Sequence, residues 1–194
     1  MRSTSVLPEG YGQIYSIDLQ KDKKMSIIVN VIAALIAVAM IVPVHFIVPI
    51  TTLFTFDDTY VFRFMALAGL YVLYIILHEA VHGIAMKICK TKKVKYGFTG
   101  LYAFAGSDDY YTKGSYIFIA LAPVVLWGVV IGIANYFVPR EWFWVIYFLQ
   151  VGNISGAAGD FFVTFKFLGM PRDILVHDHG VGMQVYSSTG NQSH

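Results

Sequence analysis

The sequence is poor in charged residues. Asp, Glu, Lys and Arg make up only 13% of its 194 residues, against about 25% in an average soluble domain, whereas 57% are hydrophobic. It has a single cysteine, Cys89, so an intrachain disulfide is excluded and nothing indicates an oxidising compartment. The 14 basic and 12 acidic residues nearly balance, and we expect no nucleic-acid partner. Scarce charge and abundant apolar side chains favour a protein that resides in the lipid bilayer.

Four apolar segments are long enough to cross a bilayer, which requires about 20 residues of helix. We place these spans at about 25–48, 61–88, 115–137 and 142–168. They form a membrane domain at 25–170, between a cytoplasmic amino-terminal tail at 1–24 and a cytoplasmic carboxy-terminal tail at 171–194. The sequence therefore predicts an all-α fold, an integral membrane four-helix bundle.

The basic residues are distributed unevenly between the two sides of these spans. Twelve of the 14 lie in the amino-terminal tail, in the 87–113 region or beyond residue 165, and only Arg63 and Arg140 lie on the other side. Because cytoplasmic loops carry the excess of Lys and Arg, this distribution predicts that both termini are cytoplasmic.

An HExxH motif lies in the second predicted span, at His78-Glu79-Ala80-Val81-His82. Residues four apart share one face of a helix, so the two imidazoles can reach one cation. Glu79 projects from a neighbouring part of that face, where it can act as a general base toward water. Two neutral nitrogen ligands, a base and an open coordination position are typical of zinc hydrolases. Histidines satisfied inside a bundle are the alternative, which is weaker in a membrane span because ionisable groups there are costly and usually functional.

The fourth predicted span supplies a carboxylate, Asp160, at the end of a run of small residues that lets another helix approach closely. His82 lies about six residues, and Asp160 about eight, before the cytoplasmic end of its span, so at about 1.5 Å per residue their depths agree. A zinc ion held by two histidines lacks an anionic ligand, and we predict that His78, His82 and Asp160 hold Zn²⁺ with water in the fourth position. A hydrogen bond between Asp160 and Asn153, or a wet cleft around Asp160, is the alternative.

With these residues in place, the chain resembles the membrane-embedded zinc metalloproteases of the site-two kind. It resembles more closely a bacterial family of small four-span proteins described as putative zincin peptidases. The similarity covers most of residues 60–186. The matching motifs are His78-Glu79-Ala80-Val81-His82-Gly83, Leu121-Ala122-Pro123 and Asn153 through Asp160.

The resemblance implies peptide-bond hydrolysis within a bacterial cell membrane. It also implies zinc bound by His78, His82 and Asp160, Glu79 as the catalytic base, and a role for Asn153 in holding the substrate or the oxyanion. Site-two proteases present their aspartate in a proline-containing segment that breaks the helix. Here the flanking residues are glycine and phenylalanine, at positions 159 and 161.

Between the second and third spans, aromatic residues alternate around glycines at 94–105, which is typical of strands. We predict a short β-hairpin-like segment there, cytoplasmic or re-entrant. Two interpretations stay open. Its edge pairs with an unwound substrate by strand addition, or it is a surface hairpin that caps the bundle. In the tail, His177 and His179 flank Asp178; weak metal binding is possible there, and a solvated loop before a strand at Val185-Tyr186 is favoured.

Taken together, these features predict an enzyme, an intramembrane zinc metalloendopeptidase that hydrolyses a peptide bond in a membrane-associated protein or peptide. The alternative is a non-catalytic metal-binding membrane scaffold or partner subunit that retains the zinc site. A small cation transporter is a third possibility, against which four short spans without internal symmetry argue. The sequence names neither the substrate nor the oligomeric state.

Overall fold

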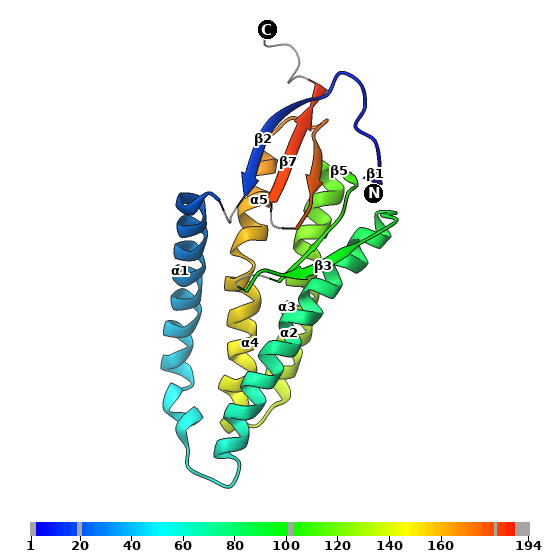
Figure 1. Ribbon diagram of the computed structural model, residues 1–194. Helices are drawn as coiled ribbons and strands as arrows, with labels where there is room; N and C mark the ends of the chain where they lie inside the picture. The colour runs from blue at the N-terminus through cyan, green and yellow to red at the C-terminus, as the bar shows by residue number, and fades with distance from the viewer. Residues whose placement is uncertain (1–2, 19–20, 101–102, 181, 189–194) are drawn as a thin grey trace. The chain divides into compact units, whose positions relative to one another are not determined.

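The computed structural model describes residues 3–18, 21–100, 103–180 and 182–188 (Figure 1). The helices are α1 (Lys23–Ile47), η1 (Ile50–Phe54), α2 (Tyr60–Ile88), α3 (Lys113–Phe137), η2 (Arg140–Trp142), α4 (Phe143–Gly156) and α5 (Ala158–Leu168), where η marks a 3₁₀ helix. The strands are β1 (Ser3–Thr4), β2 (Gly12–Asp18), β3 (Lys95–Phe98), β4 (Ala103–Gly106), β5 (Tyr110–Thr112), β6 (Leu175–Asp178) and β7 (Gly182–Ser187).

The fold is therefore mixed α/β, and the predicted all-α fold is wrong. The predicted tails at 1–24 and 171–194 contain β1, β2, β6 and β7, which join β5 in a five-stranded sheet. The loop expected around Asp178 is strand β6. The hairpin expected between spans two and three is present, because β3 and β4 pair antiparallel with Tyr96 opposite Ala105. Residues 101–102 of the predicted hairpin segment, and residues 1–2, 19–20, 181 and 189–194 of the predicted tails, lie outside the described residues.

The five-stranded sheet has the order β1-β5-β6-β7-β2, and every neighbouring pair is antiparallel. Strands β2 and β7 lie side by side although they come from opposite ends of the chain (Figure 1). Tyr111, Val176 and Val185 stand opposite one another on three adjacent strands, and all three are fully buried. Their shared face is the apolar side of the sheet, and it fixes the register.

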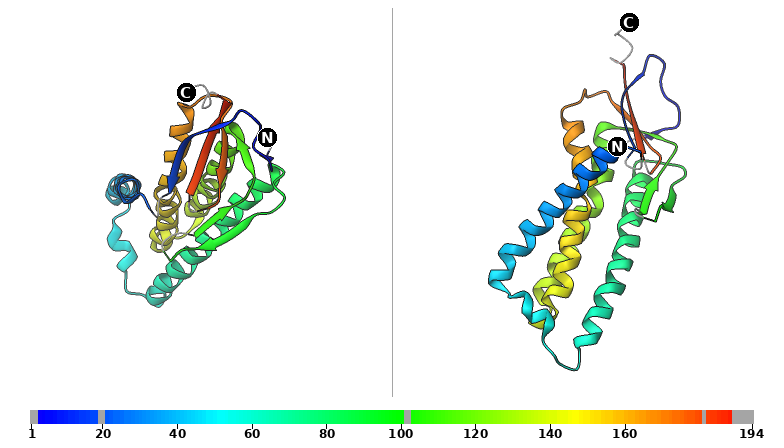
Figure 2. Two further views of the ribbon diagram at one scale, coloured as in Figure 1. Left: turned by 45° about the horizontal axis from the view of Figure 1, so that its top comes forward. Right: turned by 60° about the vertical axis from the view of Figure 1, so that its left-hand side comes forward.

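Three helices of the described residues, α1, α2 and α3, are long and apolar enough to cross a membrane. This property indicates association with a membrane. Helix α2 is one uninterrupted helix of 29 residues (Figure 2). The predicted fourth span at 142–168 is instead divided into α4 and α5, since Ala157 leaves the helical conformation at φ −81° and ψ 16°. Neither piece reaches the length of about 20 residues that a straight span needs, and four spans stay a prediction.

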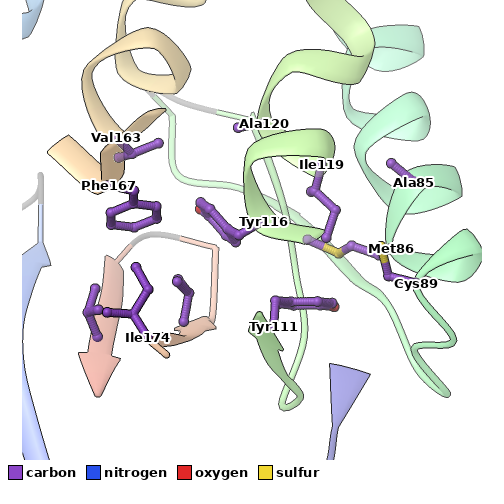
Figure 3. Packing of buried hydrophobic residues seen from close by; sticks show 12 residues of the cluster. Ala85, Met86, Cys89, Tyr111, Tyr116, Ile119, Ala120, Val163, Phe167 and Ile174 are labelled. Atoms are coloured by element: carbon purple, nitrogen blue, oxygen red, sulfur yellow. The ribbon is translucent and has the colours of Figure 1, made fainter. Parts of the chain in front are cut away.

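The chain forms two compact units. The first consists of Met1–Ile28, Glu79–Ala122 and Asp160–His194, and the second of Val29–His78 and Pro123–Gly159. In the first unit, aromatic and aliphatic side chains of the sheet pack with those of α2, α3 and α5 around Tyr116 and Phe167 (Figure 3). Cys89 is fully buried in this cluster, and burial raises the pKa of its thiol, so this cysteine is a packing residue and not a reactive one.

The second unit has its core around Trp144, Val145 and Leu53, which are buried against residues of α1 and α2. Arg63 is also fully buried there, and its guanidinium donates hydrogen bonds to both carboxylate oxygens of Asp57, at 2.9 and 2.8 Å. These bonds lower the pKa of Asp57 to about 2. A buried charge needs such a partner, so this pair fixes the loop that precedes α2.

We predict that Gly106→Ala destabilises the first unit. A Cβ at Gly106 would lie 2.6 Å from the backbone N of Gly180, which has a φ of +101° and itself favours glycine. Backbone atoms cannot move aside cheaply, and we expect a loss of about 1–3 kcal/mol in the free energy of unfolding, measured by denaturation in detergent. Gly114→Ala is the matched control, since a Cβ there meets no atom within 4 Å. Equal midpoints for the two variants would contradict this prediction.

Candidate metal centre

The HExxH motif lies on α2, and its middle residue, Ala80, is eight residues before the end of the helix at Ile88. A ligand atom of His78, one of Glu79 and one of His82 all lie within 4.8 Å of one another, close enough for one ion to contact all three. His82 is buried and the other two are partly exposed. The helical spacing of four residues thus brings the two imidazoles together, as the sequence predicts.

A backbone carbonyl holds the ring of His82. Its Nδ1 lies 2.9 Å from the carbonyl oxygen of Ile119 on α3, and both residues belong to the first unit. A carbonyl oxygen can only accept a hydrogen bond, so Nδ1 carries a proton, and in a neutral imidazole Nε2 then carries the lone pair. That tautomer is the one in which a histidine binds a metal through Nε2 while its other nitrogen is held by an outer partner.

A chain of side chains holds the ring of His78 in the same way, within the second unit. The hydroxyl of Tyr74, one turn earlier on α2, lies 2.8 Å from His78 Nδ1 and donates to Asn153 Oδ1 at 3.0 Å. Since its only proton goes to Asn153, the hydroxyl accepts from His78 Nδ1–H. Asn153 is fully buried and donates from Nδ2 to the carbonyl of Val124 at 3.0 Å, which fixes the orientation of its amide.

The predicted site residue Asn153 therefore contacts His78 indirectly, through the hydroxyl of Tyr74. Both polar atoms of its side chain are engaged by protein groups, Tyr74 and Val124. Its contacts place it behind His78, as a residue that positions the ring.

Asp160 lies in the first turn of α5, where the positive end of the helix dipole favours a carboxylate. Its Oδ1 is 3.8 Å from Nε2 of His82, and its side chain is about one-quarter exposed. Two donors on one tetrahedral zinc ion are about 3.3–3.5 Å apart, given bonds of about 2.0–2.2 Å. The approach of Asp160 to the unprotonated nitrogen of His82 is thus compatible with a shared ion. Asp160 is outside the three-residue group on α2.

Asp178 is a neighbour of the site that the sequence did not reveal. It lies on β6 and accepts hydrogen bonds from the Tyr116 hydroxyl and, at 2.8 Å, from the backbone N–H of Gly180. Burial raises the pKa of Asp178 above its ordinary value, while these hydrogen bonds and the nearby His82 oppose the rise. Leu175–Asp178 shows no alternation of apolar and polar residues and spans just four residues, so its local sequence is a weak signal of a strand.

The hairpin is anchored directly after the motif. In the first unit, the Tyr96 hydroxyl on β3 occupies the space that a Cβ at Gly83 would take. Tyr96 and Phe98 on β3 are themselves exposed, by 58% and 72% of their surface. A glycine at this position therefore lets the hairpin approach α2 one residue beyond His82.

The donor set fits zinc. Two imidazoles with their Nδ1 atoms engaged by outer partners have Nε2 left for a metal, and a carboxylate lies beside one of them. Residues 71–175 match the family described as putative zincin peptidase, which is more than half of the chain. The chain belongs to the putative zincin peptidase family. No curated protein and no solved structure was found to match it. The matched segment of this zincin family member contains His78, Glu79, His82, Asn153 and Asp160, and it ends just before Asp178.

Proposed function

We propose that this zincin family member is an intramembrane zinc endopeptidase, with His78, His82 and Asp160 as metal ligands and Glu79 as general base. The observation that carries the proposal is the tautomeric arrangement of the motif. Both histidines have Nδ1 held by an outer partner, which orients Nε2 for a metal.

The chemistry follows from these residues. A zinc ion bound there would supply the Lewis acidity that polarises a peptide carbonyl and acidifies water. Glu79 adjoins the histidines on the same helix and takes the proton of the attacking water. It then delivers that proton to the leaving amine, because the new amine is the stronger base. His82 and His78 keep their orientation throughout, through Ile119 and Tyr74.

We further propose where the reaction occurs. Three helices suited to a bilayer, and the concentration of Lys and Arg near the amino terminus and at 87–113, support a place in a membrane. We place the chain in a bacterial cell membrane with both termini cytoplasmic, which also requires the predicted fourth crossing at 142–168. The substrate is then a membrane-associated protein or peptide. An unwound stretch of it can reach the motif from the cytoplasmic side.

The cellular test compares membrane proteomes. Cells that make the Glu79→Gln protein should accumulate at least one membrane protein that cells with the wild-type protein cleave, and sequencing of the new termini gives the cleavage site. Glu141→Gln, an exposed carboxylate-to-amide change on η2, is the matched control and should behave like wild type. Identical proteomes in all three strains would favour the non-catalytic scaffold.

We predict that Tyr74→Phe weakens zinc binding by about 10-fold, a typical effect of losing an outer-shell partner. The change removes the hydroxyl that accepts from His78 Nδ1 and donates to Asn153 Oδ1, so the ring loses its support. Competition with a chelator of known affinity measures the change. Tyr136→Phe, at a side chain that is 83% exposed, is the control. An unchanged dissociation constant for Tyr74→Phe would show that the Tyr74 hydroxyl does not hold the ligand.

A further inference from the structure

Helix α3 contains a proline at position 123, and this residue is fully buried. Proline has no backbone N–H, so it cannot donate the helical hydrogen bond to the carbonyl four residues earlier. That carbonyl belongs to Ile119, whose side chain is also buried, at 2% exposure. A buried carbonyl that loses its helical donor requires another one, because leaving it without a donor costs about 1–3 kcal/mol.

The replacement donor is a ring nitrogen of the motif. His82 Nδ1 lies 2.9 Å from the Ile119 carbonyl oxygen, on the helix neighbouring α2 in the first unit. The Ile119 carbonyl, which lacks its helical donor, is therefore hydrogen-bonded to His82. The tautomer of this histidine decides which of its ring nitrogens can bind a metal. Pro123 leaves one carbonyl of α3 without its helical donor, and the fold places His82 within hydrogen-bonding distance of that same carbonyl.

We propose that Pro123 is a positioning residue for the metal centre, which acts by keeping the Ile119 carbonyl available to His82 Nδ1–H. A full-strength acceptor fixes His82 in the Nδ1–H tautomer and directs Nε2 toward the metal. The proposal rests on the proposed zinc site but is independent of peptide-bond hydrolysis. It also assigns a chemical role to Pro123 beyond helix geometry.

The direct test restores the missing N–H. In Pro123→Ala, the amide N–H of residue 123 donates to the Ile119 carbonyl, which then shares its acceptor capacity between this N–H and His82. We expect the zinc dissociation constant to rise by up to about 10-fold, the lower end of the effect of losing an outer-shell partner. Pro43→Ala is the matched control, because Pro43 also lies inside a helix, α1, and should leave zinc affinity unchanged. Zinc alone, titrated against a chelator, is the probe.

A second readout needs no metal. ¹⁵N NMR of the histidines in the zinc-free protein, at about pH 8 where an ordinary histidine is neutral, reports which ring nitrogen carries the proton. His82 should show the Nδ1–H tautomer in the wild type and a mixture of tautomers in Pro123→Ala. A wild-type His82 protonated on Nε2 would overturn the proposal even if Pro123→Ala failed to fold.

An ester at position 123 separates the missing N–H from the shape of the proline ring. Incorporation of the α-hydroxy analogue of alanine replaces the N–H with oxygen, so the ring is gone but no donor is added. We expect wild-type zinc affinity and the Nδ1–H tautomer to return. If the ester behaves like Pro123→Ala, or if Pro123→Ala matches wild type in both readouts, the proposal fails. A wild-type protein that binds no zinc at all would instead refute the proposed function.

Discussion

Replacing Glu79 with Gln should lower kcat by at least about 10²–10⁴-fold, the contribution of a positioned general base, while the purified protein keeps its zinc. Gln has nearly the shape of Glu and cannot take up a proton from water. Turnover is measured on the substrate found by the proteome comparison, with the protein in detergent or liposomes. Zinc content is measured by atomic absorption on the same preparation.

The zinc content of the Glu79→Gln protein distinguishes a catalytic base from a metal ligand at this position. Glu79 lies within the same 4.8 Å group as the two histidines, so the geometry alone also permits it to be a ligand. If Glu79→Gln loses both zinc and activity, Glu79 is a ligand and the assigned mechanism is wrong. If the variant keeps both, the protein hydrolyses peptides by another group.

Replacing Asp160 with Asn should weaken zinc binding by more than about 100-fold, beyond the roughly 10–100-fold cost of losing an outer-shell partner. The amide is neutral and a poor ligand for zinc, whereas the carboxylate lies 3.8 Å from His82 Nε2. Zinc affinity is measured by competition with a chelator, and folding by thermal unfolding of the zinc-free protein. His78→Ala should have a similar effect on affinity.

The matched control for this change is Asp108→Asn. Asp108 belongs to the same unit, pairs with Lys95 at 2.6 Å and has a side chain that is 70% exposed. Removing its charge should leave zinc affinity at the wild-type value. Wild-type affinity in Asp160→Asn would exclude Asp160 as the third ligand and leave Glu79 and the partly buried Asp178 as the candidates.

The helices and the motif were predictable because their signals are local. The spans predicted at 61–88 and 115–137 differ by no more than two residues at either end from α2 (Tyr60–Ile88) and α3 (Lys113–Phe137). An apolar run of this length stands out whatever surrounds it. In HExxH, the spacing of the histidines fixes their common face through the helical repeat alone.

The five-stranded sheet could not be predicted because its pairings join segments that are far apart in the sequence. Its strands are two to seven residues long, and β2 finds its partner β7 about 170 positions later in the chain. The register of β2 also shifts between Gln13 and Tyr15, and such a bulge breaks the two-residue alternation that marks a strand. The short strands of the two tails therefore give no sign of one shared sheet, and the sequence does not place Asp178 near His82.

The end of α4 at Gly156 could not be predicted from the sequence either. The segment before Asp160 lacks the proline that interrupts this helix in site-two proteases, yet the helix ends at Gly156 and resumes at Ala158. Gly156 ends α4, and glycine is unfavourable in a helix interior because its backbone is more flexible than that of other residues. The consequence is that Asp160 occupies a helix amino terminus and not the middle of a continuous span.

The pairing of β2 with β7 also sets the order of assembly during synthesis. The strand β7 (Gly182–Ser187) is made after every helix, and Val185, which it contributes, is part of the core that contains Tyr116 and Ile119. Long-range pairings of this kind form late, since the chain between the partners must close first. Insertion of the helices can therefore precede completion of the unit that holds His82 and Asp160. If the proposed zinc site is correct, a nascent chain would become able to bind metal only after β7 has left the ribosome.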